Sequence, residues 1–139
     1  MMPRPVSQPL TLFGVAQRGM SAQLVRMNAA SSNLANAGSV STTEAGTYRP
    51  IRPVFTEQFD KASGLSTVNV SAVVRSSAAP VKEHNPNHPL ADAEGNIFTA
   101  PVDENAEMVE MLDASRQYQN LVEALSTAKQ LMLDTLRMK

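Results

Sequence analysis

Two histidines are the side chains of this sequence best suited to ligate a metal or to move a proton. His84 and His88 stand four residues apart, and three acidic residues lie close to them: Glu83, Asp92 and Glu94. A spacing of four brings two imidazoles to the same side only when the backbone is helical. Pro86 and Pro89 exclude a helix at this point. We therefore predict a proline-fixed surface loop, and neither a metal site nor a cofactor.

Other reactive side chains lack the partners that would activate them. The absence of Cys excludes thiolate catalysis, disulfides and sulfur-ligated zinc. Ser and Thr are abundant, but the sequence contains no Gly-x-Ser-x-Gly elbow and no glycine-rich phosphate loop. Glu107, Glu110 and Asp113 lie near the start of an expected helix, where a solvated face and the helix dipole explain them. The sequence therefore predicts a protein that is not an enzyme.

The composition favours a small domain with a lean core. The 139 residues carry a net charge of −1, and 4% of them are aromatic, beside eight Met and no Trp. Apolar material of this kind favours helix-on-helix packing over a thick globular core. The balanced charge predicts no binding of nucleic acid or of anionic lipid. Apolar runs are far shorter than the roughly 20 residues of a membrane span, and no signal-peptide pattern follows residues 1–5.

Long helices are expected near both ends, because the nine prolines leave proline-free windows at 10–49 and 102–139. In each window apolar residues recur at gaps of three and four with a mean of 3.5, which is typical of a packed helix seam. The first series is Phe13, Ala16, Met20, Leu24, Met27, Ala30 and Leu34. The second is Met108, Met111, Ser115, Tyr118, Val122, Leu125, Ala128 or Lys129, Met132 and Leu136. Thr11 is placed to cap the first helix, and Gly38 to follow its end.

The second helix is apolar on more than one face, since further leucines stand at 112, 121, 131 and 133. A hairpin of two helices leaves one side of each in water, so this stripe needs a partner from outside the chain. Charge is also divided between the ends. Residues 1–43 carry three Arg and no acid, whereas residues 103–139 carry seven acids and four bases. We expect the two helices to attract each other, or each other's copies.

The segment between the helices is predicted to be a linker and a small β-rich region with loops, which divides the chain into parts at 1–38, 39–102 and 103–139. Residues 48–59 suit an edge strand because they include Pro50 and Pro53. A turn is expected at 60–64 and a strand at 68–75, where polar and apolar residues alternate. A turn is expected at residues 92–96, before a short apolar piece at 97–98. The stretch 37–47 is rich in Ser, Thr and Gly and is expected to be mobile. The fold class is therefore mainly α, with the terminal helices paired as a coiled coil and short antiparallel strands between them.

Polar amides interrupt both helices. Asn28, Asn33 and Asn36 lower helix propensity where the apolar pattern demands a helix. The block at 115–120, Ser-Arg-Gln-Tyr-Gln-Asn, is its equivalent in the second helix. Polar groups beside a helix seam fix register and partner number, so these blocks favour a specified assembly over a plain core.

These two blocks also carry a family resemblance. The stretch Ser-Asn-Leu-Ala-Asn-Ala at 32–37 and the stretches at 107–109 and 114–120 resemble the paired terminal signatures of the bacterial flagellar rod and hook family. Residues 48–49, the strand around 68–74, the loop at 85–95 and the ending at 131–136 resemble the same family. The resemblance covers nearly the whole chain from about residue 10.

The resemblance implies a structural subunit of the flagellar basal body. In such a protein the terminal helices pair as a coiled-coil layer around the axial export channel, the β-rich part packs outside, and the assembled proximal rod transmits motor torque. The implied partners are other rod proteins, copies of the same chain, and the membrane-ring and export-gate proteins at the rod base. The subunit would be exported through the flagellar type III apparatus without a cleaved signal peptide. Helices that bury their stripes only against neighbours would be partly disordered before assembly.

Fifteen residues are therefore predicted to lie at assembly interfaces, between subunits or between the two helices. A rival hypothesis is a small helical adaptor or regulator that binds one partner helix in a groove. A hydrolase is a third alternative, disfavoured because neither histidine is well placed. The predicted interface residues are Phe13, Met20, Leu24, Met27, Asn33, Leu34, Asn36, Met111, Arg116, Tyr118, Asn120, Val122, Leu125, Met132 and Leu136.

Overall fold

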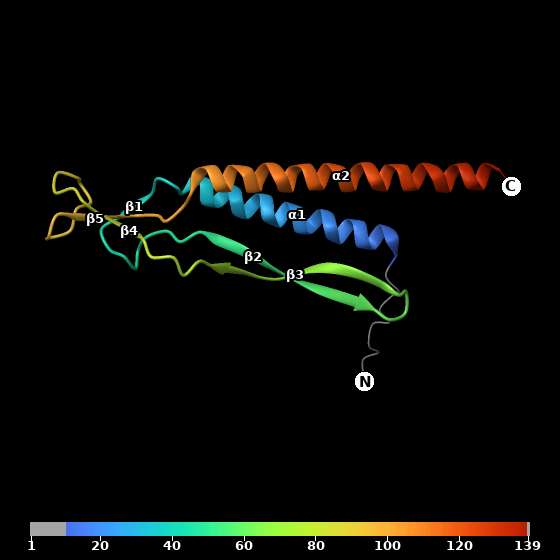
Figure 1. Cartoon of the computed structure of the whole chain (residues 1–139), viewed down its shortest axis with the longest axis horizontal. Coiled ribbons are helices and arrows are strands. Elements are labelled where there is room, and N and C mark those ends of the chain that lie inside the picture. Colours follow the sequence, from blue (N-terminus) through green and yellow to red (C-terminus); the bar gives the residue numbers. More distant parts are fainter. Residues whose placement is uncertain (1–10, 139) are drawn as a thin grey trace, which may run out of the picture.

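Two long helices from opposite ends of the sequence pack side by side and antiparallel (Figure 1). Helix α1 spans Leu12–Ala35 and helix α2 spans Glu104–Arg137, in a computed structural model that describes residues 11–138. Their positions confirm the two helices that the proline-free windows predict. With short antiparallel strands between them, the chain is mainly α with a small β region. Coiled-coil geometry of the pair stays a prediction.

Local side chains determine where the helices begin and end. The Thr11 hydroxyl accepts a hydrogen bond from the Gly14 N–H at 3.1 Å, which confirms the predicted cap. Asp103 caps α2 in the same way, through the Ala106 N–H at 3.1 Å. The end of α1 is earlier than expected, because Asn36 rather than Gly38 terminates the helix. The Asn36 amide donates to the Ser32 carbonyl at 2.8 Å and satisfies a backbone group of the last turn.

A long hairpin is formed by strands β2 (Ile51–Asp60) and β3 (Leu65–Arg75), as the pattern predicts. The turn between them contains Gly64 at φ 69°, a left-handed conformation that favours glycine. The missing N–H of Pro53 costs β2 no ladder hydrogen bond. The Pro50 carbonyl accepts a hydrogen bond from the Ser76 N–H at 2.7 Å, so the pair Pro50–Ser76 is a hydrogen-bonded one. Hydrogen-bonded and non-bonded pairs alternate along an antiparallel ladder, and three residues further on Pro53 therefore lies opposite Val73 at a non-bonded position.

A small sheet at the far end of the molecule has the strand order β1-β5-β4, all antiparallel (Figure 1). Its strands are β1 (Val40–Ser41), β4 (Val81–His84) and β5 (Asn96–Thr99). The predicted apolar piece at 97–98 lies in β5. The pattern missed β4, and the expected mobile stretch 37–47 instead contains β1 and a hydrogen-bonded turn. Hydroxyls hold that turn, with Thr47 donating to the Thr43 carbonyl at 2.9 Å.

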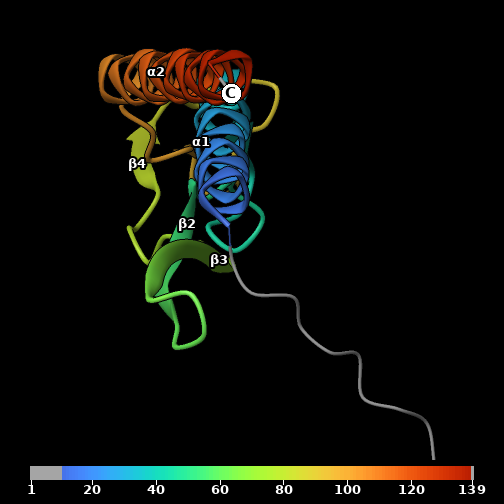
Figure 2. The same cartoon turned by 90° about the vertical axis from the view of Figure 1, so that its right-hand side faces the viewer.

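Helix α1 is the middle layer, with α2 on one side and the β2–β3 hairpin on the other (Figure 2). The buried hydrophobic residues in the described part of the chain are six Ala and one Ile: Ala22, Ala29, Ala30, Ala37, Ala100, Ala114 and Ile97. Small residues let the layers approach closely, but they bury little apolar area. Large apolar side chains therefore remain on the surface of both helices.

The face that α1 buries within the chain is rotated from the predicted seam. The buried residues of α1 are Ala22, Ala29, Ala30 and Asn33. Of these only Ala30 belongs to the predicted apolar series, and Leu24 of that series is 43% exposed. In α2 the buried positions are Glu107 and Ala114. The predicted apolar seams therefore lie partly outside the contact that one chain makes with itself.

Candidate assembly interface

The three layers meet at Asn33, whose side chain is completely buried. Its amide nitrogen donates to the Ile51 carbonyl at 3.0 Å and to Glu107 Oε2 at 3.1 Å. Its oxygen accepts from the Tyr48 hydroxyl and from the Ile51 N–H, both at 2.8 Å. One side chain of α1 thus binds both the start of the hairpin and the first turns of α2.

The geometry of the hairpin explains why an amide fits this position. Ile51 lies next to Pro50, which bonds to Ser76, so Ile51 occupies a non-bonded position and directs its N–H and C=O away from β3. An Asn side chain carries one donor group and one acceptor, as a peptide unit does. Asn33 therefore satisfies both backbone groups of Ile51 in place of a further strand.

Glu107 is the acidic member of the same cluster, and its side chain is 1% exposed. Arg52 Nη1 donates to Glu107 Oε2 at 2.8 Å, and Arg52 Nη2 forms a second bond to Oε1. Burial raises the pKa of Glu107, but the bonds from Arg52 and Asn33 outweigh burial and leave this pKa below its usual value. The bond with Glu107 in turn raises the pKa of Arg52.

The expectation of a solvated acidic face is therefore wrong for Glu107. This residue stands four before Met111 and seven before Ala114, so it lies on the side of α2 that faces α1. The spacing of Glu107 to these two residues in the sequence therefore indicated that it faces α1. Its ion-pair partner comes from β2, and no sequence pattern connects Arg52 to α2.

A second polar contact joins the helices one turn further along. Arg26 Nε lies 2.7 Å from Glu110 Oε1, and Arg26 Nη2 lies 2.9 Å from Asp113 Oδ2. The hydrogen bond with Glu110 is the largest cause of the raised pKa of Arg26. This contact confirms, within one chain, the predicted attraction between the basic first helix and the acidic second one.

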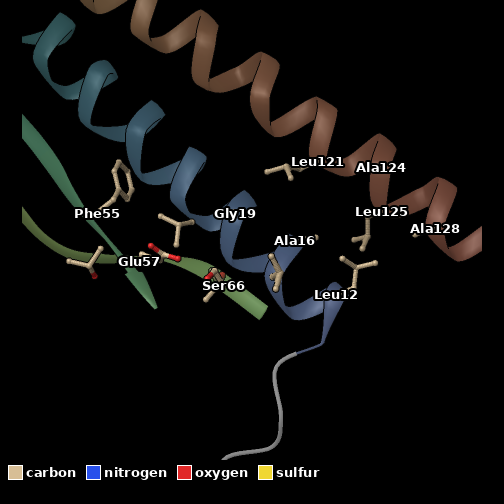
Figure 3. Close-up of a pocket in the computed structure, with 14 residues that line it drawn as sticks. Leu12, Ala16, Gly19, Phe55, Glu57, Ser66, Leu121, Ala124, Leu125 and Ala128 are labelled. Carbon is tan, nitrogen blue, oxygen red and sulfur yellow. The ribbon is translucent and has the colours of Figure 1, made fainter. Parts of the chain in front are cut away.

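Towards the start of α1 the helices diverge, and an apolar groove opens between them and the hairpin (Figure 3). Its volume is about 620 Å³. The side chain of Leu121 points from α2 toward α1 at Gly19, where an added Cβ would lie 3.1 Å from Leu121 Cδ1. We call this feature the groove, and define it by its lining residues: Leu12, Val15, Ala16, Gly19, Phe55, Thr56, Glu57, Ser66, Thr67, Val68, Leu121, Ala124, Leu125 and Ala128.

Helix α2 continues beyond the groove and beyond the start of α1 (Figure 1). We call residues 129–138 the overhang, and every one of them is exposed. Five are large and apolar: Leu131, Met132, Leu133, Leu136 and Met138. On the part of α2 that does pack on α1, the outward side chains Val109 and Leu112 are also exposed.

The predicted interface residues separate into three groups. Asn33 alone among them is buried. The half-buried ones are Phe13, Met20, Met27, Leu34, Asn36, Met111, Tyr118 and Leu125. The exposed ones are Leu24, Arg116, Asn120, Val122, Met132 and Leu136. The structure brings Asn33 into the central cluster and Leu125 into the groove, and it leaves the third group exposed on the surface of the chain. Their role as interface residues stays a prediction.

The histidine segment contributes to loop structure. His88 Nδ1 accepts from the Leu90 N–H at 3.0 Å, and His84 Nδ1 lies 3.3 Å from Asn96 Oδ1. Within residues 11–138, no three His, Cys, Asp or Glu side chains gather closely enough to hold a metal ion. In the same part of the chain, neither helix has the length and apolar character needed to cross a membrane.

Two family models match the ends of the chain. Residues 13–40 match the family described as flagella basal body rod protein. Residues 94–138 match the C-terminal family of the flagellar basal body rod FlgEFG proteins. The first match covers α1 except for its first residue, and the second covers all of α2, so both long helices belong to matched regions.

Relatives of known name match over most of the chain. The flagellar basal-body rod protein FlgC of Salmonella typhimurium is 43% identical over 129 residues, which cover 91% of this chain and 95% of the relative. FlgC of Escherichia coli O157:H7 has the same identity and coverage. FlgC of Yersinia enterocolitica is 39% identical over 127 residues, again 91% of this chain and 95% of the relative. From this similarity, which covers 91% of the chain, we conclude that the chain belongs to the FlgC family of flagellar basal-body rod proteins.

Proposed function

We propose that this chain serves the basal body as a mechanical part of the proximal rod, which transmits motor torque and surrounds the export channel, and that it performs no catalysis. The terminal helices would pack with those of neighbouring subunits as a coiled-coil layer, with the hairpin and the small sheet outside it. The uncovered apolar side chains of α1 and α2 carry this proposal.

The exposure of these side chains supports an assembled state. Val109 is 66% exposed and Leu112 is 61% exposed, although both lie on a helix that packs against α1. Monomeric proteins rarely leave contiguous apolar surface of this kind in water. Neighbouring subunits would cover it, and the buried Ala core of a single chain would then be supplemented by contacts between chains.

The polar clusters support a role in transmitting force. Asn33, Glu107 and Arg52 join α1, α2 and β2, and Arg26 joins the two helices again at Glu110. Buried, fully bonded polar groups resist sliding, because any shift leaves several of them without partners. A subunit joined in this way would rotate as one body.

The remaining parts of the proposal follow the family. The partners would be other rod proteins and copies of this chain, with membrane-ring and export-gate proteins at the rod base. Export would use the flagellar type III apparatus, without removal of a signal peptide. The intact mass of the chain recovered from purified rods tests that last point, since cleavage would give a shorter product.

Leu24 offers the cleanest test of the interface, because its exposed side chain contributes little to the fold of one chain. In a flagellated bacterium without its own copy of this protein, the wild-type chain should restore swimming. Leu24→Asp should remain exported but fail to support rod assembly, because it places a charge on an apolar contact. Leu24→Met is the matched control, since it keeps an apolar side chain of similar volume.

Normal swimming and rod assembly with Leu24→Asp would contradict the assignment of this face. Failure of Leu24→Met would show instead that the position tolerates no change of shape. Leu125→Asp is expected to abolish motility as well, but Leu125 is half-buried in the groove and its loss also affects the fold.

A further inference from the structure

The groove and the overhang are two surfaces of the same chain whose apolar side chains no other part of the described structure covers. Most side chains that line the groove are apolar, and its polar ones, Thr56, Glu57, Ser66 and Thr67, all come from the hairpin (Figure 3). The overhang carries Leu131, Met132 and Leu136 on one side of α2, with Thr135 between them. The groove is a concave apolar surface and the overhang is a projecting apolar one, so the two are complementary.

The overhang of a chain does not reach the groove of the same chain. Ala128 is the last residue of α2 that lines the groove, and the helix runs straight on from there (Figure 1). The ten residues of the overhang extend for about 15 Å in the direction away from the groove. Contact between the two surfaces therefore requires a second copy.

Thr67 supplies an independent indication that the groove receives a partner. Its side chain lines the groove and its residue is 5% exposed, yet its hydroxyl has no hydrogen-bond partner within residues 11–138. Buried hydroxyls in native proteins are nearly always paired, because an unpaired one costs free energy. A group that enters the groove would supply the missing partner.

We propose that the overhang of one copy docks in the groove of the next, with Leu131, Met132 and Leu136 against its apolar lining. This inference rests on the proposed structural role and names a partner for it. Thr135 donates its own hydroxyl proton to the Leu131 carbonyl at 2.8 Å, so its oxygen keeps acceptor capacity. Thr67 of the receiving copy donates to that oxygen.

Charge at the rim agrees with this occupant. Glu57 lines the groove, and within the described residues its carboxylate has no hydrogen bond or ion pair. Lys129 stands seven residues before Leu136, so it flanks the apolar stripe on the same side of the helix. Docking brings Lys129 of one copy close to Glu57 of the next, at the edge of an apolar contact. Such a charge pair determines the orientation of the docked helix more than the affinity of the two copies.

The arrangement is head-to-tail, because each copy offers one groove and one overhang. Contacts of this kind do not pair two identical patches, and they continue from copy to copy. A ring or a helical row results, whereas docking of two overhangs against each other would stop at a dimer.

Disulfide trapping in the full-length chain tests the contact directly, since the sequence contains no Cys. Ala16→Cys places a thiol in the groove, and Leu136→Cys places one on the overhang. When the two variants are mixed at high concentration and oxidised, the mixed dimer should exceed each self-dimer by about tenfold. The control pairs Leu136→Cys with Ala62→Cys, at the exposed hairpin turn, and should give a statistical mixture.

Two results of this experiment, and one result of a separate deletion, would overturn the proposal. A statistical mixture with Ala16→Cys would mean that the groove does not receive the overhang. A dominant Leu136→Cys self-dimer would mean that two overhangs pair with each other. A large gain in self-association after deletion of residues 2–10 would identify the leading segment of the same chain as the occupant.

Thr67→Val separates docking from folding, because the two effects have opposite signs. The isosteric change removes an unpaired hydroxyl, so the unfolding midpoint of the isolated chain should rise. The same change removes the proposed bond to Thr135, so self-association should weaken about fivefold. Unchanged self-association would contradict the role of Thr67.

The proposed function is tested separately by swimming in the deletion strain. If the wild-type chain restores swimming but no mixed dimer forms, docking is wrong and the structural role stands. If the wild-type chain neither restores swimming nor enters rods, the structural role itself is wrong.

Discussion

Asn33→Asp is the smallest change that should disrupt the central cluster, because it replaces the amide NH₂ with an oxygen and keeps the shape. The lost donor serves the Ile51 carbonyl at 3.0 Å and Glu107 Oε2 at 3.1 Å. The new carboxylate would face both of these acceptors. The bonds from Tyr48 and from the Ile51 N–H, which the Asn33 oxygen accepts, would remain possible.

The expected loss follows from these two bonds. A hydrogen bond to a neutral group contributes about 1 kcal/mol and one to a charged group about 1.5–3 kcal/mol. Repulsion between two buried carboxylates adds to this, although Arg52 offsets part of it. We expect Asn33→Asp to lower the free energy of unfolding by about 4 kcal/mol at pH 7, a large part of the 5–15 kcal/mol typical of a domain.

The free energy of unfolding of Asn33→Asp should also depend on pH in a way that the wild type does not. Two facing carboxylates share a proton more readily than either does alone, so the folded variant binds a proton that the unfolded chain has released. Stability of Asn33→Asp should therefore rise as the pH falls from 7 to 5. Wild-type stability should be nearly constant over this range, because the pKa of Glu107 is already low.

Urea titrations followed by circular dichroism at both pH values measure these effects. Asn36→Asp is the matched control, since the Asn36 amide bonds to Ser32 inside its own helix and should cost about 1 kcal/mol. A loss below about 1 kcal/mol for Asn33→Asp, or the same pH profile as the wild type, would refute the reasoning. Adding Glu107→Gln should restore part of the loss, because an amide can donate to the new carboxylate.

Three further predictions concern other parts of the chain. In acid, the lowered pKa of Glu107 means that the unfolded chain takes up a proton first, so stability should fall below about pH 4.3, and less steeply in Glu107→Gln. Gly95→Ala should destabilise the small sheet by about 1–3 kcal/mol in a urea titration, because Gly95 has φ 76° and an added Cβ would lie 2.9 Å from Pro86 Cβ. In hydrogen exchange of the dilute chain, amides of the overhang should exchange within seconds while those of α2 near Ala114 stay protected, because every residue of the overhang is exposed whereas Ala114 is buried.

The sequence pattern was sufficient to predict the helices and the hairpin, because their signals are local. Proline-free windows and apolar gaps of three and four depend on residues within one helix, and Thr11 caps the residue beside it. The hairpin was equally visible in the alternation at 68–75 and in the turn before it. The strands β1 and β4 were missed, since such short strands are defined by their pairing with β5.

The contacts of the central cluster could not be predicted from local sequence patterns, because they join residues far apart in the chain. The sequence singled out Asn33 as a polar residue in an apolar helix, and its fit to both backbone groups of Ile51 appears only in the folded chain. Glu107 was expected in solvent, because acidic residues near a helix start usually lie there. Its burial depends on Arg52 of β2, a residue 55 positions away.

The sequence alone determined that this chain has two amphipathic helices and more apolar helix surface than one such pair can cover. The tertiary structure decided which side of each helix faces inward. Small Ala side chains and one polar cluster occupy that inner side, since they allow the layers to approach closely while the buried Asn33 and Glu107 side chains stay hydrogen-bonded. Many of the larger side chains consequently face outward, in the groove and on the overhang, which are the surfaces that we propose for contacts with other subunits.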